Sequence, residues 1–149
     1  MTVTTRTFTV APKPAEVLEY LADFGNAEEW DPGTISCTRP DSGPVEIGTS
    51  WKNVSKFVGR EVELTYTLQE RTDSRVVFVG TNDSATSTDT IEVVPNGAGS
   101  RITYTADLEM HGVAKLATPI VKVMFEKLGN ETEDQMSDVL NGLGTRRST

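Results

Sequence analysis

Asp89 is the residue whose type and position most clearly allow chemistry. It lies in an expected strand that begins at Ala85, where alternation puts it on the same face as Ile91 and Val93. If that face points inward, loss of water raises the pKa of the carboxyl and makes it a weak candidate for a general acid or base. The alternative is that Asp89 lies at the rim of the sheet and is solvated.

Asn53 and Ser55 are the second candidates, because they share one face of an expected strand with Trp51. A buried amide or hydroxyl without a partner costs about 1–3 kcal/mol. If the face points inward, this polar pair needs water, a ligand or each other, which favours a position at a pocket.

His111 and Cys37 are weaker candidates for a functional role. His111 stands beside Gly112 at a strand end with no nucleophile motif nearby, so we expect a surface histidine. One cysteine cannot form an internal disulfide, and one histidine cannot build a common zinc site. The chain also lacks the G-x-S-x-G, phosphate-loop, G-x-G-x-x-G and H-E-x-x-H patterns. We therefore expect no metal and no cofactor.

The element that must position these residues is a long amphipathic helix, expected from Thr118 to Leu143. Thr118 and Pro119 supply a start signal. Its apolar face contains eight residues: Ile120, Val121, Met124, Phe125, Leu128, Met136, Val139 and Leu143. Thr132 and Gln135 interrupt that face, and Gly129 with Asn130 introduces a point where the helix could bend or divide.

Almost everything before this helix has the pattern of strands joined by short turns. Two short helices are expected after the first strand, one opening at Pro14 and one over Asn26–Trp30. The sequence predicts seven strands, over Thr2–Val10, Thr34–Arg39, Ser50–Phe57, Glu61–Leu68, Val76–Thr81, Ala85–Val94 and 101–110. The expected fold is therefore α+β, with a curved antiparallel sheet of about seven strands wrapped around the C-terminal helix.

A curved sheet cannot close onto one helix along its whole length, so we expect a cavity between them. Alternation predicts a ligand-binding wall of Trp51, Asn53, Ser55, Tyr66, Tyr104 and either Phe78 or its neighbours, because both faces of Val76–Thr81 are apolar; Met124 and Leu128 contribute from the helix. Trp30 either closes one end of this cavity or anchors the core. The alternative for all the large apolar residues is that they only pack.

Composition limits the partners. The 149 residues carry a net charge of −8, which argues against nucleic acids and anionic membrane surfaces. No leader opens the chain, and no apolar run approaches the roughly 18 residues that span a bilayer. We expect one domain over residues 1–149, located in the cytoplasm, as a monomer or a weak homodimer.

The chain resembles the START-like, or SRPBCC, superfamily of polyketide cyclases and lipid-transport proteins. The resemblance rests on the order of elements and on five short segments: Pro14, Trp30-Asp31-Pro32, residues 45–49, residues 89–93, and Gly97 and Gly99 leading to Ile102-Thr103-Tyr104. It implies a helix-grip fold with a hydrophobic ligand cavity. The superfamily includes carriers, cyclases, hydrolase-like enzymes and receptors, so fold alone leaves the activity open.

Two hypotheses of function follow. The first is binding of a small hydrophobic or aromatic molecule, such as a lipid or a polyketide-like compound. The second is an enzyme of the cyclase or dehydratase type, in which Asp89 or a tyrosine moves protons on such a molecule. A third reading, a protein-interaction module, has slight support because the outer faces are charged and rich in threonine.

Overall fold

The structure is a computed structural model that describes residues 2–57 and 59–143. Within them the elements run in the order β1 (Thr2–Val10), α1 (Pro14–Ala22), η1 (Phe24–Asn26), α2 (Ala27–Trp30), β2 (Thr34–Thr38), β3 (Ser50–Phe57), β4 (Arg60–Arg71), β5 (Arg75–Thr81), β6 (Ala85–Asn96), β7 (Gly99–Met110), η2 (Gly112–Ala117) and α3 (Thr118–Asn141). The expected order of one strand, two short helices, six strands and a long helix is confirmed.

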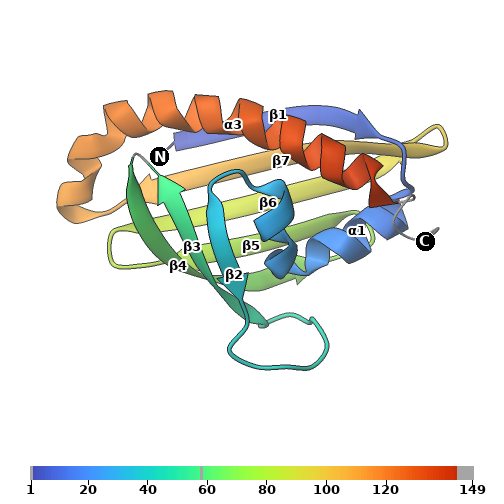
Figure 1. Ribbon diagram of the computed structural model, residues 1–149, viewed down its shortest axis with the longest axis horizontal. Helices are drawn as coiled ribbons and strands as arrows, with labels where there is room; N and C mark the ends of the chain where they lie inside the picture. The colour runs from blue at the N-terminus through green and yellow to red at the C-terminus, as the bar shows by residue number, and fades with distance from the viewer. Residues whose placement is uncertain (1, 58, 144–149) are drawn as a thin grey trace.

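The strands form one antiparallel sheet in the order β1-β7-β6-β5-β4-β3-β2. Helix α3 lies across the concave face of this sheet beside β1 and β7, and α1 and α2 pack on the same side (Figure 1). The pairing shifts register between Thr34 and Ser36 and between Leu68 and Glu70. Such irregularities increase twist and bending, which helps the sheet curve around the helix. This is the predicted helix-grip fold.

Strand β6 is central to the sheet, because it pairs with β5 on one side and β7 on the other. Every second residue along it is buried: Ala85, Ser87, Asp89, Ile91 and Val93. The alternation expected from the sequence therefore places the Asp89 side chain on the concave face. The alternative of a solvated carboxyl at the rim is wrong.

Helix α3 does not divide at Gly129. A Cβ atom there would lie 2.9 Å from Thr4 Oγ1 and 3.1 Å from Arg6 Nη2, so the absent side chain lets the helix approach β1 closely. The buried face is Val121, Phe125, Gly129, Thr132, Met136, Leu140 and, just after the helix, Leu143. The expected stripe was wrong for Ile120, which is 59% exposed, because the buried face follows the two small residues Gly129 and Thr132.

Hydrogen bonds fix the helix at several places, two of which join it to β1 and to α2. Arg6 on β1 pairs with Glu126 at 3.1 Å and donates from Nε to Asn130 Oδ1 at 3.1 Å. Gln135, which interrupts the apolar stripe, donates from Nε2 to the carbonyl oxygen of Glu29 at 2.8 Å. These bonds connect α3 to β1 and to α2.

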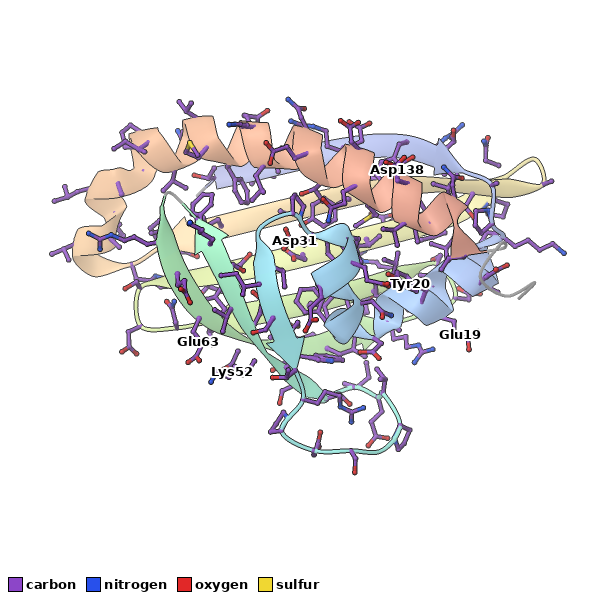
Figure 2. The ribbon with its side chains drawn as sticks, viewed as in Figure 1. Glu19, Tyr20, Asp31, Lys52, Glu63 and Asp138 are labelled. Atoms are coloured by element: carbon purple, nitrogen blue, oxygen red, sulfur yellow. The ribbon has the colours of Figure 1, made fainter. Side chains whose placement is uncertain are left out.

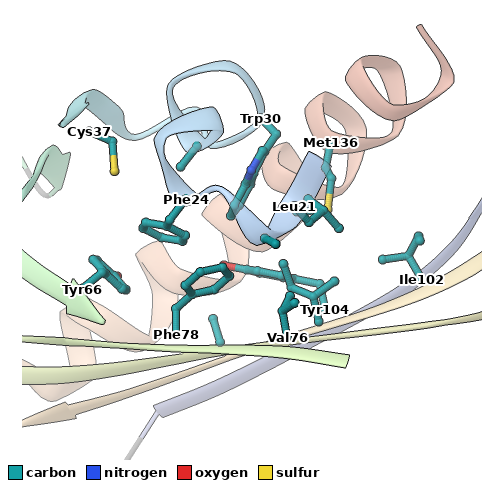
Figure 3. Packing of buried hydrophobic residues seen from close by; sticks show 14 of the residues in the cluster. Leu21, Phe24, Trp30, Cys37, Tyr66, Val76, Phe78, Ile102, Tyr104 and Met136 are labelled. Atoms are coloured by element: carbon teal, nitrogen blue, oxygen red, sulfur yellow. The ribbon is translucent and has the colours of Figure 1, made fainter. Parts of the chain in front are cut away.

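Aromatic side chains fill one half of the space between sheet and helix. Phe24, Trp30, Trp51 and Phe78, here called the aromatic cluster, are at most 1% exposed. Phe24 contacts each of the other three, with ring centroids 4.6–6.1 Å apart. Figure 3 shows Phe24 and Trp30 projecting from the α1–α2 segment onto the sheet. The short helices therefore close this half of the interior.

The described part of the chain contains no helix that is long and apolar enough to cross a membrane.

Candidate functional site

A cavity of about 620 Å³ occupies the other half of the interior, between the sheet and the first turns of α3. The short helices do not reach this half, so the mismatch between a curved sheet and one helix stays unfilled. Its wall is largely apolar and is formed by Phe57, Val62, Leu64, Tyr66, Ala85, Tyr104, Ala106, Leu108, Met110, Ala117, Ile120, Val121, Phe125 and Leu128.

The cavity opens to solvent between β3, β4 and the start of α3. Four charged, exposed residues border it there and are here called the mouth: Lys56, Arg60, Glu61 and Glu63. Phe57 and Phe125 meet edge to face across this side, with centroids 6.4 Å apart. Several apolar residues nearby are also exposed, among them Val113, Leu116 and Ile120. A ligand entering here would meet a mixed polar and apolar rim.

Asp89 lies on the inner wall of the cavity and is 5% exposed. Its one hydrogen bond within the described residues is from Ser87 Oγ to Oδ1, at 3.5 Å. Burial and, to a smaller extent, the negative charge of Asp31 raise the pKa of Asp89 to about 8, against the lowering effect of the Ser87 hydroxyl. At neutral pH the group is therefore largely a carboxylic acid that can donate a proton.

Asp31 lies directly after α2 and also lines the cavity. Figure 2 shows it in the interior, whereas Lys52 lies on the outer side of the sheet. Its carboxyl accepts from the Gly33 amide at 3.0 Å and from Thr34 Oγ1 at 2.9 Å. Burial raises the pKa of Asp31, and these two hydrogen bonds oppose the rise.

Two tyrosines complete the polar part of the wall. Tyr66 and Tyr104 are each 7% exposed. Burial raises the pKa of both phenols well above the usual value, and the charge of Asp89 adds to the effect. Both hydroxyls therefore stay protonated and can act as hydrogen-bond donors.

A chain of hydrogen bonds runs from the cavity wall to Asp31. Ser55 Oγ donates to Asn53 Oδ1 at 2.5 Å, and Asn53 Nδ2 donates to Thr34 Oγ1 at 3.2 Å. Thr34 in turn donates to Asp31. The Asn53–Ser55 pair is thus satisfied by each other and by Thr34, and the chain holds the Asp31 carboxylate in place.

Five of the residues predicted for the site line this cavity: Ser55, Tyr66, Asp89, Tyr104 and Leu128. Asn53 lies behind the wall and supports Ser55. Trp30, Trp51 and Phe78 are not in the lining; they are fully buried in the aromatic cluster, because α1 and α2 fill that part of the interior. Met124 borders a separate hollow of about 150 Å³ on the outer side of Leu128.

Sequence reasoning overlooked Asp31, Ser87 and Phe125 as lining residues. Ser87 could have been found, since it precedes Asp89 by two positions on an alternating strand. Phe125 was already placed on the inner face of the helix. Asp31 gave no periodic signal, because it stands in a turn whose direction depends on the fold.

His111 and Cys37 lie outside the cavity lining. The half-buried His111 shares a hydrogen bond between Nε2 and Thr86 Oγ1 at 2.9 Å, so the expectation of a free surface histidine was only partly right. Burial raises the pKa of the Cys37 thiol to about 12, which leaves it unreactive as a nucleophile. Among residues 2–57 and 59–143 no group of three or more potential metal ligands was found.

Solved structures of similar fold come from several bacteria. Protein TTHA0849 from Thermus thermophilus superposes with a TM-score of 0.77 at 14% identity, over 99% of both chains. The Zhui aromatase/cyclase from Streptomyces sp. R1128 gives 0.75 at 14% identity, over 99% of this chain and 95% of that one. A START superfamily protein from Mycobacterium smegmatis gives 0.70 at 16% identity, over 94% of each chain. At these identities the likeness concerns the fold.

A search of curated protein sequences finds no match. The sequence model of one family, described as polyketide cyclase/dehydrase and lipid transport, matches residues 1–140. With the helix-grip architecture and the cavity under α3, this match shows that the chain belongs to the polyketide cyclase/dehydrase and lipid transport family.

Proposed function

We propose that the protein binds a small, mostly apolar or aromatic molecule in the cavity between the sheet and α3. The observation that carries this proposal is the cavity itself, about 620 Å³ in volume, with an apolar wall and a few converging polar groups. Sites for drug-sized molecules have this size and composition. At ~25 cal/mol per Å², burying a few hundred Å² of apolar ligand surface contributes several kcal/mol.

The residues proposed to contact the ligand are Tyr66, Tyr104 and Leu128, with Ser55 and Asp89 as polar contacts. The family assignment supports the proposal, since this family comprises ligand-binding and ligand-converting proteins of one fold. We also propose that residues 1–149 act as one START-like unit, because the family model and the structural neighbours span nearly the whole chain.

The proposal can be tested with the neutral fluorescent probe N-phenyl-1-naphthylamine. Ala106 lines the cavity from β7, so Ala106→Phe should occupy part of the space and weaken probe binding by about tenfold or more. The matched control is Thr105→Phe, whose side chain lies on the opposite face of the same strand and should leave binding unchanged. Equal affinity of both folded variants for the probe would place binding elsewhere and refute the proposal.

The second candidate is an enzyme of the cyclase or dehydratase type. It is favoured by one specific observation: Asp89 is buried, faces the cavity and has a pKa of about 8, so it can give or take a proton near neutral pH. Two neutral phenols, Tyr66 and Tyr104, could orient a carbonyl oxygen beside it.

An aryl β-hydroxyketone tests this second candidate, because loss of water produces a conjugated enone that absorbs in the ultraviolet. Asp89→Asn should abolish turnover while N-phenyl-1-naphthylamine still binds within about twofold of the parent affinity. Turnover that survives in Asp89→Asn would remove the carboxyl from the mechanism. Failure of the parent protein to convert any such substrate would leave ligand binding as the function.

A further inference from the structure

We propose that the cavity selects ligands that carry a basic nitrogen, such as an aromatic alkylamine, whose protonated amine pairs with Asp89 while the hydrophobic part lies against α3. This inference rests on the proposed function, of which it names the ligand class. It is drawn from the hydrogen bonding, the charge distribution and the aromatic groups of the inner wall.

The first observation is an incompletely bonded carboxyl aimed into the cavity. Asp89 is only 5% exposed and lines the cavity, yet its Oδ2 atom has no hydrogen bond within the described part of the chain. The bond from Ser87 Oγ to Oδ1 is long, at 3.5 Å. A buried carboxyl can accept about four hydrogen bonds, so most of its acceptor capacity is open to a ligand.

The second observation is the sign of the charge on the inner wall. Asp31 and Asp89 both line the cavity, and neither belongs to an ion pair of the described residues. The cationic side chains that line the cavity, Lys56 and Arg60, are exposed at the mouth. A ligand cation would therefore supply the counter-charge that the described residues do not place there.

This charge distribution separates the ligand classes. A fatty acid or another anion would bring a negative group beside Asp31 and Asp89 in a region of low dielectric, where it is repelled by the charge on Asp31 and opposes ionisation of Asp89. A neutral ligand brings no charge into the cavity and leaves the protonation of the two carboxyls unchanged. A protonated amine can donate to Asp89 Oδ2 in a charge-assisted hydrogen bond, and the aromatic part of the same ligand can pack beside Tyr66 and Tyr104, which line the same cavity.

Binding of such a cation must displace a proton from Asp89. In the free protein the pKa of Asp89 is about 8, because of burial and of the charge on Asp31. The ligand cation stabilises the carboxylate, so at pH 7 one proton leaves Asp89 for solvent as the ammonium group binds. Affinity therefore rises with pH until Asp89 is ionised in the free protein.

The other titratable or charged groups of the lining are Asp31, Tyr66 and Tyr104 inside, and Lys56, Arg60, Glu61 and Glu63 at the mouth.

Three probes of one size test the inference by isothermal titration calorimetry: 2-(2-naphthyl)ethylamine, 2-(2-naphthyl)ethanol and 2-naphthylacetic acid. At pH 8.5 the amine should bind about tenfold or more tightly than the alcohol, and the acid should bind most weakly. Asp89→Asn should remove the preference for the amine and leave the alcohol within about threefold. Glu92→Gln, which removes an exposed carboxylate on the outer face of the same strand, is the matched control and should keep the preference.

A second measurement needs no variant. Titration of the unmodified protein at pH 7 in buffers of different ionisation enthalpy should show release of nearly one proton per bound amine and none per bound alcohol. This result also distinguishes specific pairing at Asp89 from general attraction by the acidic molecule, because attraction alone releases no proton.

Equal or weaker binding of the amine relative to the alcohol, or amine binding without proton release, would overturn the inference and leave the proposed function standing. Failure of all three probes to bind, at concentrations where N-phenyl-1-naphthylamine also fails, would refute both.

Discussion

Asp31 and Asp89 face one cavity from different elements, Asp31 after helix α2 and Asp89 from the middle of β6, and the charge of the first raises the pKa of the second. Asp31 is held by donors from Gly33 and Thr34, whereas the one donor to Asp89 in the described part of the chain is the distant Ser87 hydroxyl. The two carboxyls therefore differ in their readiness to hold a proton, and Asp89 is the one more easily kept neutral.

Stability should depend on pH through Asp89. The pKa of Asp89 is about 8 in the folded protein, whereas an unperturbed aspartic acid titrates near ~3.9. Between these values the folded state holds a proton that the unfolded chain has lost, so the free energy of unfolding falls as pH rises and levels off above about 8. The slope from this group is at most about 1.4 kcal/mol per pH unit.

Asp89→Asn should flatten that slope and make the protein more stable than the parent at pH 8.5, as measured by urea unfolding. Glu92→Gln is the control, since it removes an exposed carboxylate on the outer face of the same strand. A parent protein whose stability is flat between pH 5 and 8 would show that Asp89 is ionised throughout.

The two tryptophans should differ in their tolerance of phenylalanine. Trp51 Nε1 donates to Asp23 Oδ1 at 3.2 Å, whereas Trp30 Nε1 is buried with no hydrogen-bond partner among the described residues. Both substitutions remove similar volume, but only Trp51→Phe loses a hydrogen bond. We expect Trp51→Phe to destabilise the protein more than Trp30→Phe by about 1 kcal/mol. Urea unfolding measures both, and the reverse order would mean that Trp30 is the better bonded ring.

Gly129→Ala should be destabilising, although alanine favours helices. The added methyl group would lie 2.9 Å from Thr4 Oγ1, so α3 or β1 would have to move, at a cost of roughly 1–3 kcal/mol. Gly142 at the end of α3 is the matched control, because its Cβ would meet no atom closer than 3.4 Å. Gly142→Ala should therefore change stability by less than about 1 kcal/mol. If Thr4→Ala fails to restore part of the loss, close approach is not the cause.

Gly80→Ala should reduce ligand affinity rather than only stability. A Cβ atom at Gly80 would lie 2.6 Å from Cζ of Tyr66, the residue directly opposite it on β4. The Tyr66 ring would have to move off the sheet, into the cavity that it lines. We expect N-phenyl-1-naphthylamine to bind the variant about tenfold less tightly. Replacing Tyr66 by leucine in the same variant should recover part of that loss, and no change in either variant would show that the ring is not in contact with the probe.

Much of the fold could be predicted because each local signal agreed with the final structure. Alternation gave the strands and the inward faces of most of them, although both faces of Val76–Thr81 are apolar and left its inward face undecided. Pro119 marked the start of α3. The buried face of α3 was less predictable. Gly129 and Thr132 are buried because they allow contact with β1, and no hydrophobicity pattern marks such small residues as core positions.

The cavity wall was harder to predict, since alternation gives the face on which a side chain lies but not what covers it. Trp51, Phe78 and Tyr66 all contact Phe24 from the segment between α1 and α2, yet of these three only Tyr66 also lines the cavity. The position of those short helices depends on long-range packing. The position of Trp30 could not be predicted for the same reason. It is the last residue of α2, and the packing of that helix on the sheet buries its side chain in the core.

The aromatic cluster and the cavity occupy separate halves of one interior, and this division bears on how proteins of this shape can diversify. Ala106, Leu64 and Phe125 line the cavity and none of them belongs to the aromatic cluster, so replacements there alter the ligand site while the four rings of the cluster are unchanged. New ligand preferences can thus arise by a few replacements on one side while the other side keeps the molecule folded.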